Sequence, residues 1–260
     1  MQTSQLAEKI IVVTGGTQGL GEAIARHLVE QGAAGMVICG RNRTNGENVC
    51  EALQAAGCPT VYVPGDLSIE ADCREVMRIC DTRFGRVDGL VNVAADTARG
   101  TLEDSSVEFW DRQFALNARA PFILMQDAVR IMKREKIAGS IVNIITMSCY
   151  AGEPYLTPYC ASKGALATLT KNAANALAYD RIRVNGVNIG WMSTPSEHGR
   201  QEAMGQPDNW LERADAECPF GRLLRPSDPV QLVALLLSDE SGMMTGSLID
   251  FDQTVIGGRS

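Results

Sequence analysis

The chain has 260 residues, an apolar fraction of 45% and a formal net charge of −7 at pH 7. This length suits one large α/β domain or two small ones, and it can bury enough surface to fold without a metal or disulfide staple. The negative charge argues against nucleic acid or an anionic membrane as the main partner, although a local arginine could still hold an anionic substrate.

The first residues, Met1 to Lys9, lack the charged-then-apolar layout of a secretory signal peptide. No apolar run reaches the ~18 residues that a membrane-spanning helix needs. The eight cysteines include no Cys-x-x-Cys pair, and neither histidine lies at metal-ligand spacing from any of them. We therefore expect a cytoplasmic protein without a metal site, whose cysteines serve as small apolar residues.

Short apolar runs alternate with helical stretches along the chain. The expected strands cover residues 9–14, 36–39, 60–63, 89–93, 140–145, 183–189 and 247–251. The expected helices cover residues 21–30, 45–56, 69–84, 106–135, 158–179 and 228–237. Strands that alternate with helices indicate βαβ units, and right-handed crossovers then predict a doubly wound, Rossmann-type α/β fold with a mostly parallel sheet and helices on both faces.

Residues 193–221 interrupt this alternation. The stretch is polar, contains three prolines and three glycines, and has one short helical patch near 208–217. A long insertion in a compact α/β domain is usually a lid or a binding loop. It is too short for a second domain, so residues 1–260 are expected to form one domain with a substrate loop at about 193–221.

A glycine-rich loop from Thr14 to Gly21 joins the first expected strand to the first helix, with the spacing Gly-x-x-x-Gly-x-Gly. Glycines let the backbone turn sharply and approach a pyrophosphate closely, and the helix N-terminus adds free N–H groups and a partial positive charge. The loop therefore predicts dinucleotide binding. The contacts expected from it are Gly15, Thr17, Gln18, Gly19, Leu20 and Gly21.

With this loop the chain resembles the short-chain dehydrogenase/reductase family, whose members carry Thr-Gly-x-x-x-Gly-x-Gly. The resemblance runs from Lys9 to Asp252 and includes the segment Tyr159-Cys160-Ala161-Ser162-Lys163-Gly164, which matches the family's Tyr-x-x-x-Lys. It implies an NAD(P)-dependent enzyme that transfers the pro-S hydride between nicotinamide and an alcohol or carbonyl carbon. It also implies a homotetramer. Its subunits could pair about two-fold axes through the helices at 106–135 and 158–179 and through the strand at 247–251.

The end of the second strand, Cys39-Gly40-Arg41, bears on the choice between NADP and NAD. An acidic residue here would bind the ribose hydroxyls of NAD, but Gly40 holds that position. Arg41 could pair with the 2′-phosphate of NADP, or it could be a surface residue that stacks on adenine. NADP is the expected cofactor. NAD is the alternative, because similar NADP-dependent proteins often have a basic residue where this chain has Gln18.

The resemblance implies further cofactor contacts. It places the Asp66 carboxylate against the adenine amino group, although an Asp after a strand can simply start a turn. At the end of the fourth strand, Asn92-Val93-Ala94-Ala95 stands where the family has Asn-Asn-Ala-Gly, and Asn92 is expected mainly to tie neighbouring strands. The other expected contacts are Leu67, Ala94, Tyr159, Lys163, Gly190, Met192 and Thr194. Met192 and Thr194 are expected at the nicotinamide carboxamide, and Lys163 at the nicotinamide ribose.

Tyr159 and Lys163 lie four residues apart, which places a phenol and an ammonium group on one helical face. A free Tyr has a pKa of about 10 and is a poor base at neutral pH. A nearby Lys⁺ and an oxidised nicotinamide ring favour the phenolate, so we expect a lowered pKa and a role for Tyr159 as general acid/base. Thr157 and Pro158 predict the start of this helix, with the Thr side chain as its cap.

Two hydroxyl groups compete for the task of orienting the substrate oxygen. Thr146 lies at the position of the family's catalytic Ser, thirteen residues before Tyr159, and is favoured on spacing. Ser148 would face the same side if the strand continued. By resemblance, Asn117 is the fourth catalytic residue and would hold a water that links Lys163 to bulk solvent; alternatively it only kinks its helix.

The walls of the substrate site are expected to combine carboxylates with aromatic rings. The candidates are Asp96, Glu153, Tyr155, Trp191, His198 and Trp210. Carboxylates accept hydrogen bonds from vicinal hydroxyls and rings cover C–H faces, which predicts a sugar or polyol dehydrogenase; a long acyl chain or a steroid would prefer an unbroken apolar lining. The alternative is that Asp96 and Glu153 merely cap turns and face water.

Two rival functions are less well matched. A 3-oxoacyl-carrier-protein reductase, also found in this family, would want a basic patch for an acidic carrier, whereas residues 193–221 carry six acidic residues and two arginines. A dinucleotide-binding regulator without turnover would not need the intact Tyr–Lys–Asn set.

Overall fold

The structure is a computed structural model that describes residues 5–150 and 152–257. Its strands are β1 (Ile10–Thr14), β2 (Gly35–Gly40), β3 (Thr60–Pro64), β4 (Gly89–Asn92), β5 (Ser140–Thr146), β6 (Arg183–Ile189) and β7 (Leu248–Phe251). They form one sheet in the order β3-β2-β1-β4-β5-β6-β7, and every neighbouring pair is parallel. This confirms the doubly wound α/β fold.

The strands are apolar on both faces because helices cover both sides of the sheet. All five residues of β1 and all seven of β5 are buried. Parallel sheets of this kind have continuous apolar strands rather than alternating ones. Such runs are easy to delimit in a sequence, and each expected strand boundary lies within one residue of the observed one.

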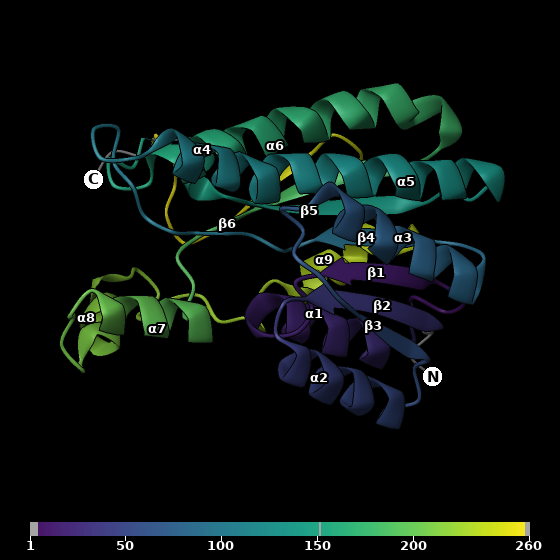
Figure 1. Ribbon diagram of the computed structural model, residues 1–260, viewed down its shortest axis with the longest axis horizontal. Helices are drawn as coiled ribbons and strands as arrows, with labels where there is room; N and C mark the ends of the chain where they lie inside the picture. The colour runs from purple at the N-terminus through teal and green to yellow at the C-terminus, as the bar shows by residue number, and fades with distance from the viewer. Residues whose placement is uncertain (1–4, 151, 258–260) are drawn as a thin grey trace.

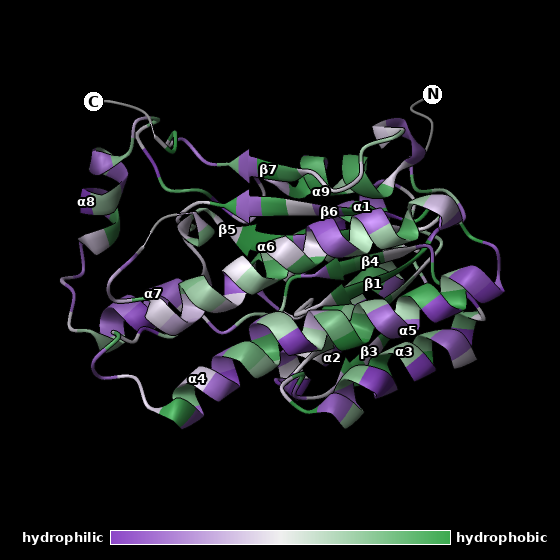
Figure 2. Cartoon of the chain, turned by 90° about the horizontal axis from the view of Figure 1, so that it is seen from above, coloured by the Kyte–Doolittle hydropathy of each residue, from purple (hydrophilic) through white to green (hydrophobic). Residues whose placement is uncertain are grey.

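The helices form two layers, which Figure 1 shows above and below the sheet. One layer contains α1 (Gly19–Glu30), α2 (Arg43–Ala55) and α9 (Val230–Leu237). The other contains α3 (Glu70–Phe84), α5 (Ala120–Arg134) and α6 (Thr157–Leu177). Figure 2 shows apolar strands between helices whose residues alternate between apolar and polar. Short 3-10 turns lie at Met147–Cys149, Ala178–Asp180 and Asp239–Ser241.

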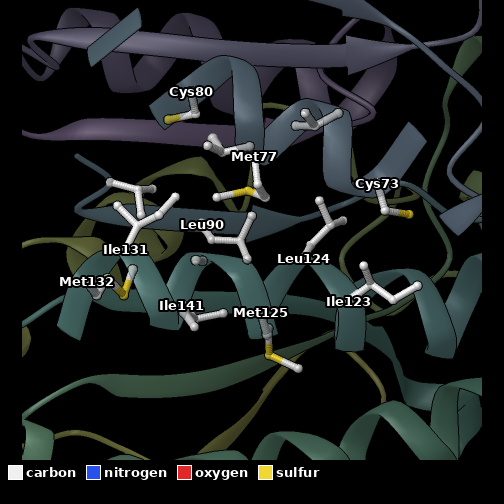
Figure 3. Close-up of a cluster of buried hydrophobic side chains, with 14 of the residues drawn as sticks. Cys73, Met77, Cys80, Leu90, Ile123, Leu124, Met125, Ile131, Met132 and Ile141 are labelled. Carbon is white, nitrogen blue, oxygen red and sulfur yellow. The ribbon is translucent and has the colours of Figure 1, made fainter. Parts of the chain in front are cut away.

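Cysteine and methionine side chains fill part of the layer that α3 and α5 form with the sheet. Figure 3 shows Cys73, Met77 and Cys80 in one buried cluster with apolar side chains of α5 such as Leu124 and Met132. All eight cysteines are free thiols. Burial raises the pKa of Cys73 and Cys80 to about 12, so these two are protonated and unreactive at neutral pH.

The expected helix at 106–135 is interrupted by one π-helical turn. It consists of α4 (Val107–Phe114), a π turn at Ala115–Arg119 and α5. Pro121 has no amide hydrogen to donate to the carbonyl of Asn117, so an α-helical bond cannot form there. The wider turn accommodates this loss and places Asn117 in the interior, where its exposed fraction is 0%.

Residues 193–221 contain two helices, where the sequence predicts one short helical patch. They are α7 (Pro195–Ala203) and α8 (Trp210–Glu217), which lie beyond the end of the sheet in Figure 1. α7 lacks apolar periodicity, but its start carries a capping signal: the Thr194 hydroxyl accepts a hydrogen bond from the Glu197 N–H at 3.1 Å, and Pro195 follows as the first helical residue.

The start of α6 differs from expectation by one residue. Thr157 is the first helical residue rather than the cap, and its hydroxyl donates to the Pro154 carbonyl at 3.4 Å. Leu156 is the N-cap residue and makes no side-chain hydrogen bond to the first turn. No helix in the described residues is both long and apolar enough to cross a membrane, and no cluster of three or more His, Cys, Asp or Glu among them could hold a metal ion.

Candidate active site

A cavity of about 950 Å³ opens at the carboxyl ends of the strands. It extends from the loop after β1, past the ends of β4 and β5, to α7 and α8. β1 and β4 are neighbours in the sheet but lead to helices on opposite faces. Ligands of open α/β sheets bind at such a switch point. The topology therefore places the glycine loop and Tyr159 in one cavity.

The glycine loop approaches its neighbours too closely for side chains. Gly15 and Gly19 have φ values of 65° and 55°, and a Cβ on Gly15 would lie 3.0 Å from the Ala94 Cα. A Cβ on Gly21 would collide with the Gly15 carbonyl oxygen. Gln18, the N-cap residue of α1, makes no side-chain hydrogen bond to the first turn, so the first amides of this helix are available to a phosphate group. The loop thus fits a pyrophosphate.

Thr14 joins the two strands of the switch point. Its Oγ1 accepts hydrogen bonds from the amides of Val93 (2.9 Å) and Ala94 (3.1 Å) and donates to the Val91 carbonyl at 3.3 Å. Ala94 lines the cavity, so Thr14 sets how the end of β4 faces the glycine loop. Sequence reasoning did not single out this residue, although it begins the glycine motif.

Gly40 leaves room for Thr17. A Cβ on Gly40 would lie 2.5 Å from the Thr17 Oγ1, so the missing acid at this position reflects a space that another side chain fills. Arg41 is exposed and lines the adjoining part of the cavity with Asp66 and Leu67. Burial raises the pKa of Asp66, but hydrogen bonds from Ser68 and the charge of Arg41 outweigh it and lower the pKa overall. Asp66 is thus a carboxylate that also caps a turn.

Tyr159 lies in the first turn of α6, buried in the cavity wall. Its hydroxyl is hydrogen-bonded to the side chain of Thr146, the last residue of β5. Burial raises the pKa of Tyr159 to about 12, and the bond to Thr146 and the charge of Arg200 offset this only in part. The expected lowering of this pKa is therefore not found. Desolvation dominates, because the phenol is enclosed by protein.

Lys163 is fully buried one helical turn further along α6. Its Nζ donates a hydrogen bond to the Ile144 carbonyl at 2.8 Å. Burial lowers the pKa of this ammonium group to about 8. Burial thus disfavours the charged form of both groups, lowering the pKa of Lys163 and raising that of Tyr159.

Ser148 is not on a continuation of β5, because the strand ends at Thr146. A 3-10 turn, Met147–Cys149, follows, and the Thr146 Oγ1 accepts a hydrogen bond from the Ser148 amide at 3.2 Å. Both hydroxyls line the cavity. Only that of Thr146 contacts Tyr159 among the interactions of the described residues.

Asn117 does not line the cavity but lies behind it in the π turn. Its Nδ2 shares two hydrogens among three acceptors, the Asp96 carbonyl (2.9 Å), Gln113 Oε1 (2.9 Å) and Ser162 Oγ (3.1 Å). Its Oδ1 accepts from the Asp96 amide at 2.9 Å. Since Ser162 precedes Lys163, Asn117 connects the segment after β4 to the helix that carries Tyr159.

The other expected cofactor residues fall into two groups. Asn92 does not line the cavity and ties β4 to β5, donating from Nδ2 to the Asn143 Oδ1 at 2.8 Å. Gly190, Met192 and Thr194 line the cavity after β6. A Cβ on Gly190 would collide with Asp252, so this position accepts only glycine without rearrangement.

Of the expected substrate residues, the structure brings together only some. Glu153, Tyr155, Trp191 and Trp210 line the cavity, but Asp96 and His198 do not. Asp96 accepts a hydrogen bond from the Ala98 amide at 2.9 Å and faces Arg112, so it caps a turn. His198 is exposed, with Nε2 at 2.9 Å from Ser193 Oγ and its ring against Trp210.

A charged cluster on the cavity wall was missed from the sequence. We call it the Glu197 cluster; it comprises Arg99, Trp191, Glu197, Arg200 and Gln201. Arg99 follows β4, Trp191 follows β6, and the other three belong to α7. The i, i+3 and i, i+4 spacing of Glu197, Arg200 and Gln201 could have shown this cluster once a helix was recognised there.

The chain is similar to a family of reductases and to several dehydrogenases. A model of the family described as enoyl-(acyl carrier protein) reductase matches residues 15–254. An NADP-dependent (R)-specific alcohol dehydrogenase of Lentilactobacillus kefiri is 33% identical over 252 residues, covering 94% of this chain and 95% of the relative. A cis-4-hydroxycyclohexanecarboxylate dehydrogenase of Sinomonas cyclohexanicum is 31% identical over 247 residues, 95% and 96% of the two chains. A 3-oxoacyl-[acyl-carrier-protein] reductase of Thermotoga maritima is 32% identical over 251 residues, 95% and 98% of the two chains.

Proposed function

The chain belongs to the short-chain dehydrogenase/reductase family, and on this basis we propose that it is an NADP(H)-preferring dehydrogenase of polyhydroxylated substrates, of the sugar or polyol class. It is an oxidoreductase that acts on alcohol or carbonyl groups. The observation that carries the proposal is that Tyr159, Lys163 and Thr146 line the same cavity as the glycine loop.

In the proposed mechanism, Thr146 and Tyr159 bind the substrate oxygen between them. Tyr159 takes the alcohol proton during oxidation and returns it during reduction. A nicotinamide cofactor held by the glycine loop would supply the hydride chemistry of both directions. Hydrogen bonds from Tyr159 and Thr146 polarise a substrate carbonyl, so these residues supply the electrostatic stabilisation of the developing oxyanion.

Lys163 has two proposed tasks. Its ammonium group favours the phenolate when Tyr159 gives up its proton, and it anchors the ribose beside the nicotinamide. With a pKa of about 8, Lys163 can exchange a proton near neutral pH. Asn117, bonded to Ser162 beside Lys163, is proposed to hold the water that continues this proton path to solvent.

The choice of NADP rests on Arg41, on the absence of an acid at Gly40 and on the NADP-dependent relative. Replacing Arg41 by Ala is expected to lower the preference for NADP over NAD by ten- to a hundredfold, which corresponds to about 1.5–3 kcal/mol for one charge-assisted contact to phosphate. The measurement is kcat/KM for each cofactor. Arg43→Ala, an exposed arginine outside the cavity, serves as the control. An unchanged ratio in Arg41→Ala would make NAD the better assignment.

The sugar or polyol class rests on Glu153 beside aromatic rings. Glu153 lines the cavity with Tyr155, Trp191 and Trp210, and the rings of Trp191 and Trp210 are 6.2 Å apart. Carboxylate and rings together suit a ligand with vicinal hydroxyls and C–H faces. The names of the relatives give them diverse substrates, which include a hydroxycyclohexanecarboxylate and a 3-oxoacyl group.

The test is a screen of specificity constants over sugars, polyols, hydroxy acids, aliphatic and steroid alcohols, and a 3-oxoacyl thioester. Polyhydroxylated compounds are expected to be preferred, and Glu153→Gln is expected to lower their kcat/KM by about tenfold, through loss of a charged hydrogen-bond acceptor. Preference for the thioester would favour the carrier-protein reductase instead. Preference for apolar alcohols, untouched by Glu153→Gln, would contradict the proposed class.

The same proposal includes a homotetramer in the cytoplasm. Val107 and Trp110 on α4 and Phe122 on α5 are exposed apolar residues, between 38% and 71% accessible. A symmetric partner could cover these neighbouring helices.

A further inference from the structure

The Glu197 cluster faces the same cavity as Tyr159, and most of its hydrogen bonds end on the Glu197 carboxylate. Glu197 Oε1 accepts from Trp191 Nε1 at 3.1 Å, from Gln201 Nε2 at 2.6 Å and from Arg99 Nη2 at 3.4 Å. Its Oε2 accepts from Arg200 Nη1 at 2.6 Å. The carboxylate is 7% exposed and is largely occupied by these donors. Glu197 is therefore a tether for the arginines rather than a ligand for substrate hydroxyls.

The arginines, in contrast, keep donors free for a ligand. Each guanidinium has five N–H groups. Arg200 uses one of them on Glu197, and Arg99 uses two, on Glu197 and on the Met204 sulfur. Both side chains line the cavity and are partly buried, with exposed fractions of 26% for Arg99 and 21% for Arg200.

The charges of the cluster do not balance. Two guanidinium groups share one carboxylate, and neither has a second acidic side chain within 4.0 Å in the described residues. Glu153 also lines the cavity and raises the pKa of Tyr155, over whose ring Arg99 lies at 5.4 Å. Arg213 and Glu217, both exposed on α8, also line the cavity and carry opposite charges. The cluster therefore has a surplus positive charge that is partly buried. Such a charge is unfavourable unless an anion binds beside it.

The surplus charge lies near the reacting groups. Arg200 is one of the charges that lower the pKa of Tyr159 against the dominant effect of burial, so its guanidinium is within electrostatic range of the phenol. Because Tyr159 and Arg200 line the same cavity, a small molecule could contact both. Arginine binds carboxylates with two parallel hydrogen bonds, which fixes orientation as well as position.

We infer that the substrate carries a carboxylate that Arg99 and Arg200 bind, so that the enzyme acts on hydroxycarboxylates, polyhydroxy acids among them. The inference rests on the proposed function for the hydroxyl chemistry and adds a second point of recognition. Glu197 holds the two arginines in place, and the substrate carboxylate supplies the missing negative charge.

The test measures binding and does not require turnover. A panel of hydroxycarboxylates of three to seven carbons, and the matching primary amides, is titrated calorimetrically into the NADPH-bound enzyme. The acids are expected to bind about ten- to a hundredfold more tightly than their amides, on the scale of one charge-assisted contact. Arg200→Gln and Arg99→Gln should each reduce this preference about tenfold, whereas Arg225→Gln, on the surface outside the cavity, should preserve it.

Two further measurements separate recognition from damage to the fold. NADPH affinity and the unfolding midpoint should be unchanged in the arginine variants. Glu197→Gln should retain or strengthen the preference for acids, since it removes a competing negative charge; a purely structural cluster would lose binding of acid and amide alike. Equal affinities for acids and amides, no binding by any acid, or an intact preference in both arginine variants would overturn the inference.

The proposed function is tested separately, by measuring the reduction of NADP. Binding of acids without any reduction of NADP would contradict the hydride-transfer proposal alone. Oxidation of neutral polyols without a preference for acids would contradict the inference alone.

Discussion

Replacing Tyr159 by Phe is expected to lower kcat by about 10²-fold or more, the usual scale for losing a general acid/base. The substitution removes only the hydroxyl that contacts Thr146, and the ring keeps its buried position in α6. Cofactor affinity should therefore be unchanged, which a fluorescence titration with NADPH can measure. The informative result is a fall in kcat at constant NADPH affinity.

Parallel Thr146→Val and Ser148→Ala variants identify the second hydroxyl. Because Tyr159 is bonded to Thr146, the larger loss is expected in Thr146→Val. A larger loss in Ser148→Ala would assign the role to Ser148. Turnover of Tyr159→Phe within threefold of the wild type would be incompatible with the proposed acid/base role.

Replacing Lys163 by Met should change both turnover and the pH dependence of stability. Turnover at neutral pH is expected to fall by about 10²–10³-fold, the scale for removing one preorganised electrostatic contact. In the wild type the folded pKa of Lys163 is about 8, below its ordinary value of 10.5. Between these values the unfolded chain holds a proton that the folded protein has lost, so Lys163 makes stability rise with pH.

The comparison of the two proteins isolates this contribution. Buried cysteines such as Cys73 and Cys80 have raised pKa values and make stability fall above pH 9 in both proteins. The difference in unfolding free energy between wild type and Lys163→Met should therefore shift in favour of the wild type from pH 8 to 10. Lys171→Met, an exposed lysine on the same helix, should show no such shift. Parallel pH profiles for wild type and Lys163→Met would contradict a depressed pKa.

The sheet could be predicted from the sequence because its strands are buried on both faces. In a run such as Ile10–Thr14, polar residues do not alternate with apolar ones, so the run is not mistaken for a surface strand. The glycine loop and the Tyr159–Lys163 pair were also evident, since their chemistry depends on spacing along the chain. Local sequence carries both kinds of signal.

Other features depend on contacts between distant segments and could not be predicted. The π turn at Asn117 follows from Pro121 together with a buried network that joins α4, α6 and the segment after β4. Residue spacing suggested that Lys163 would lower the pKa of Tyr159, but burial raises it, and burial is known only from the fold. Arg99 meets α7 across almost a hundred positions of sequence, so its place in the Glu197 cluster could not be predicted.

The packing of Thr17 against Gly40 has a consequence for how this enzyme could evolve or be redesigned. An acid at position 40 is a familiar route towards NAD, but its first side-chain carbon would fall 2.5 Å from the Thr17 hydroxyl. The effect of each change therefore depends on the other: an acid at position 40 alone distorts the loop, and a smaller residue at position 17 alone leaves an empty space. An acid at position 40 therefore calls for a change at position 17 as well, so a search that varies both positions together suits the redesign of this loop better than one that varies each alone.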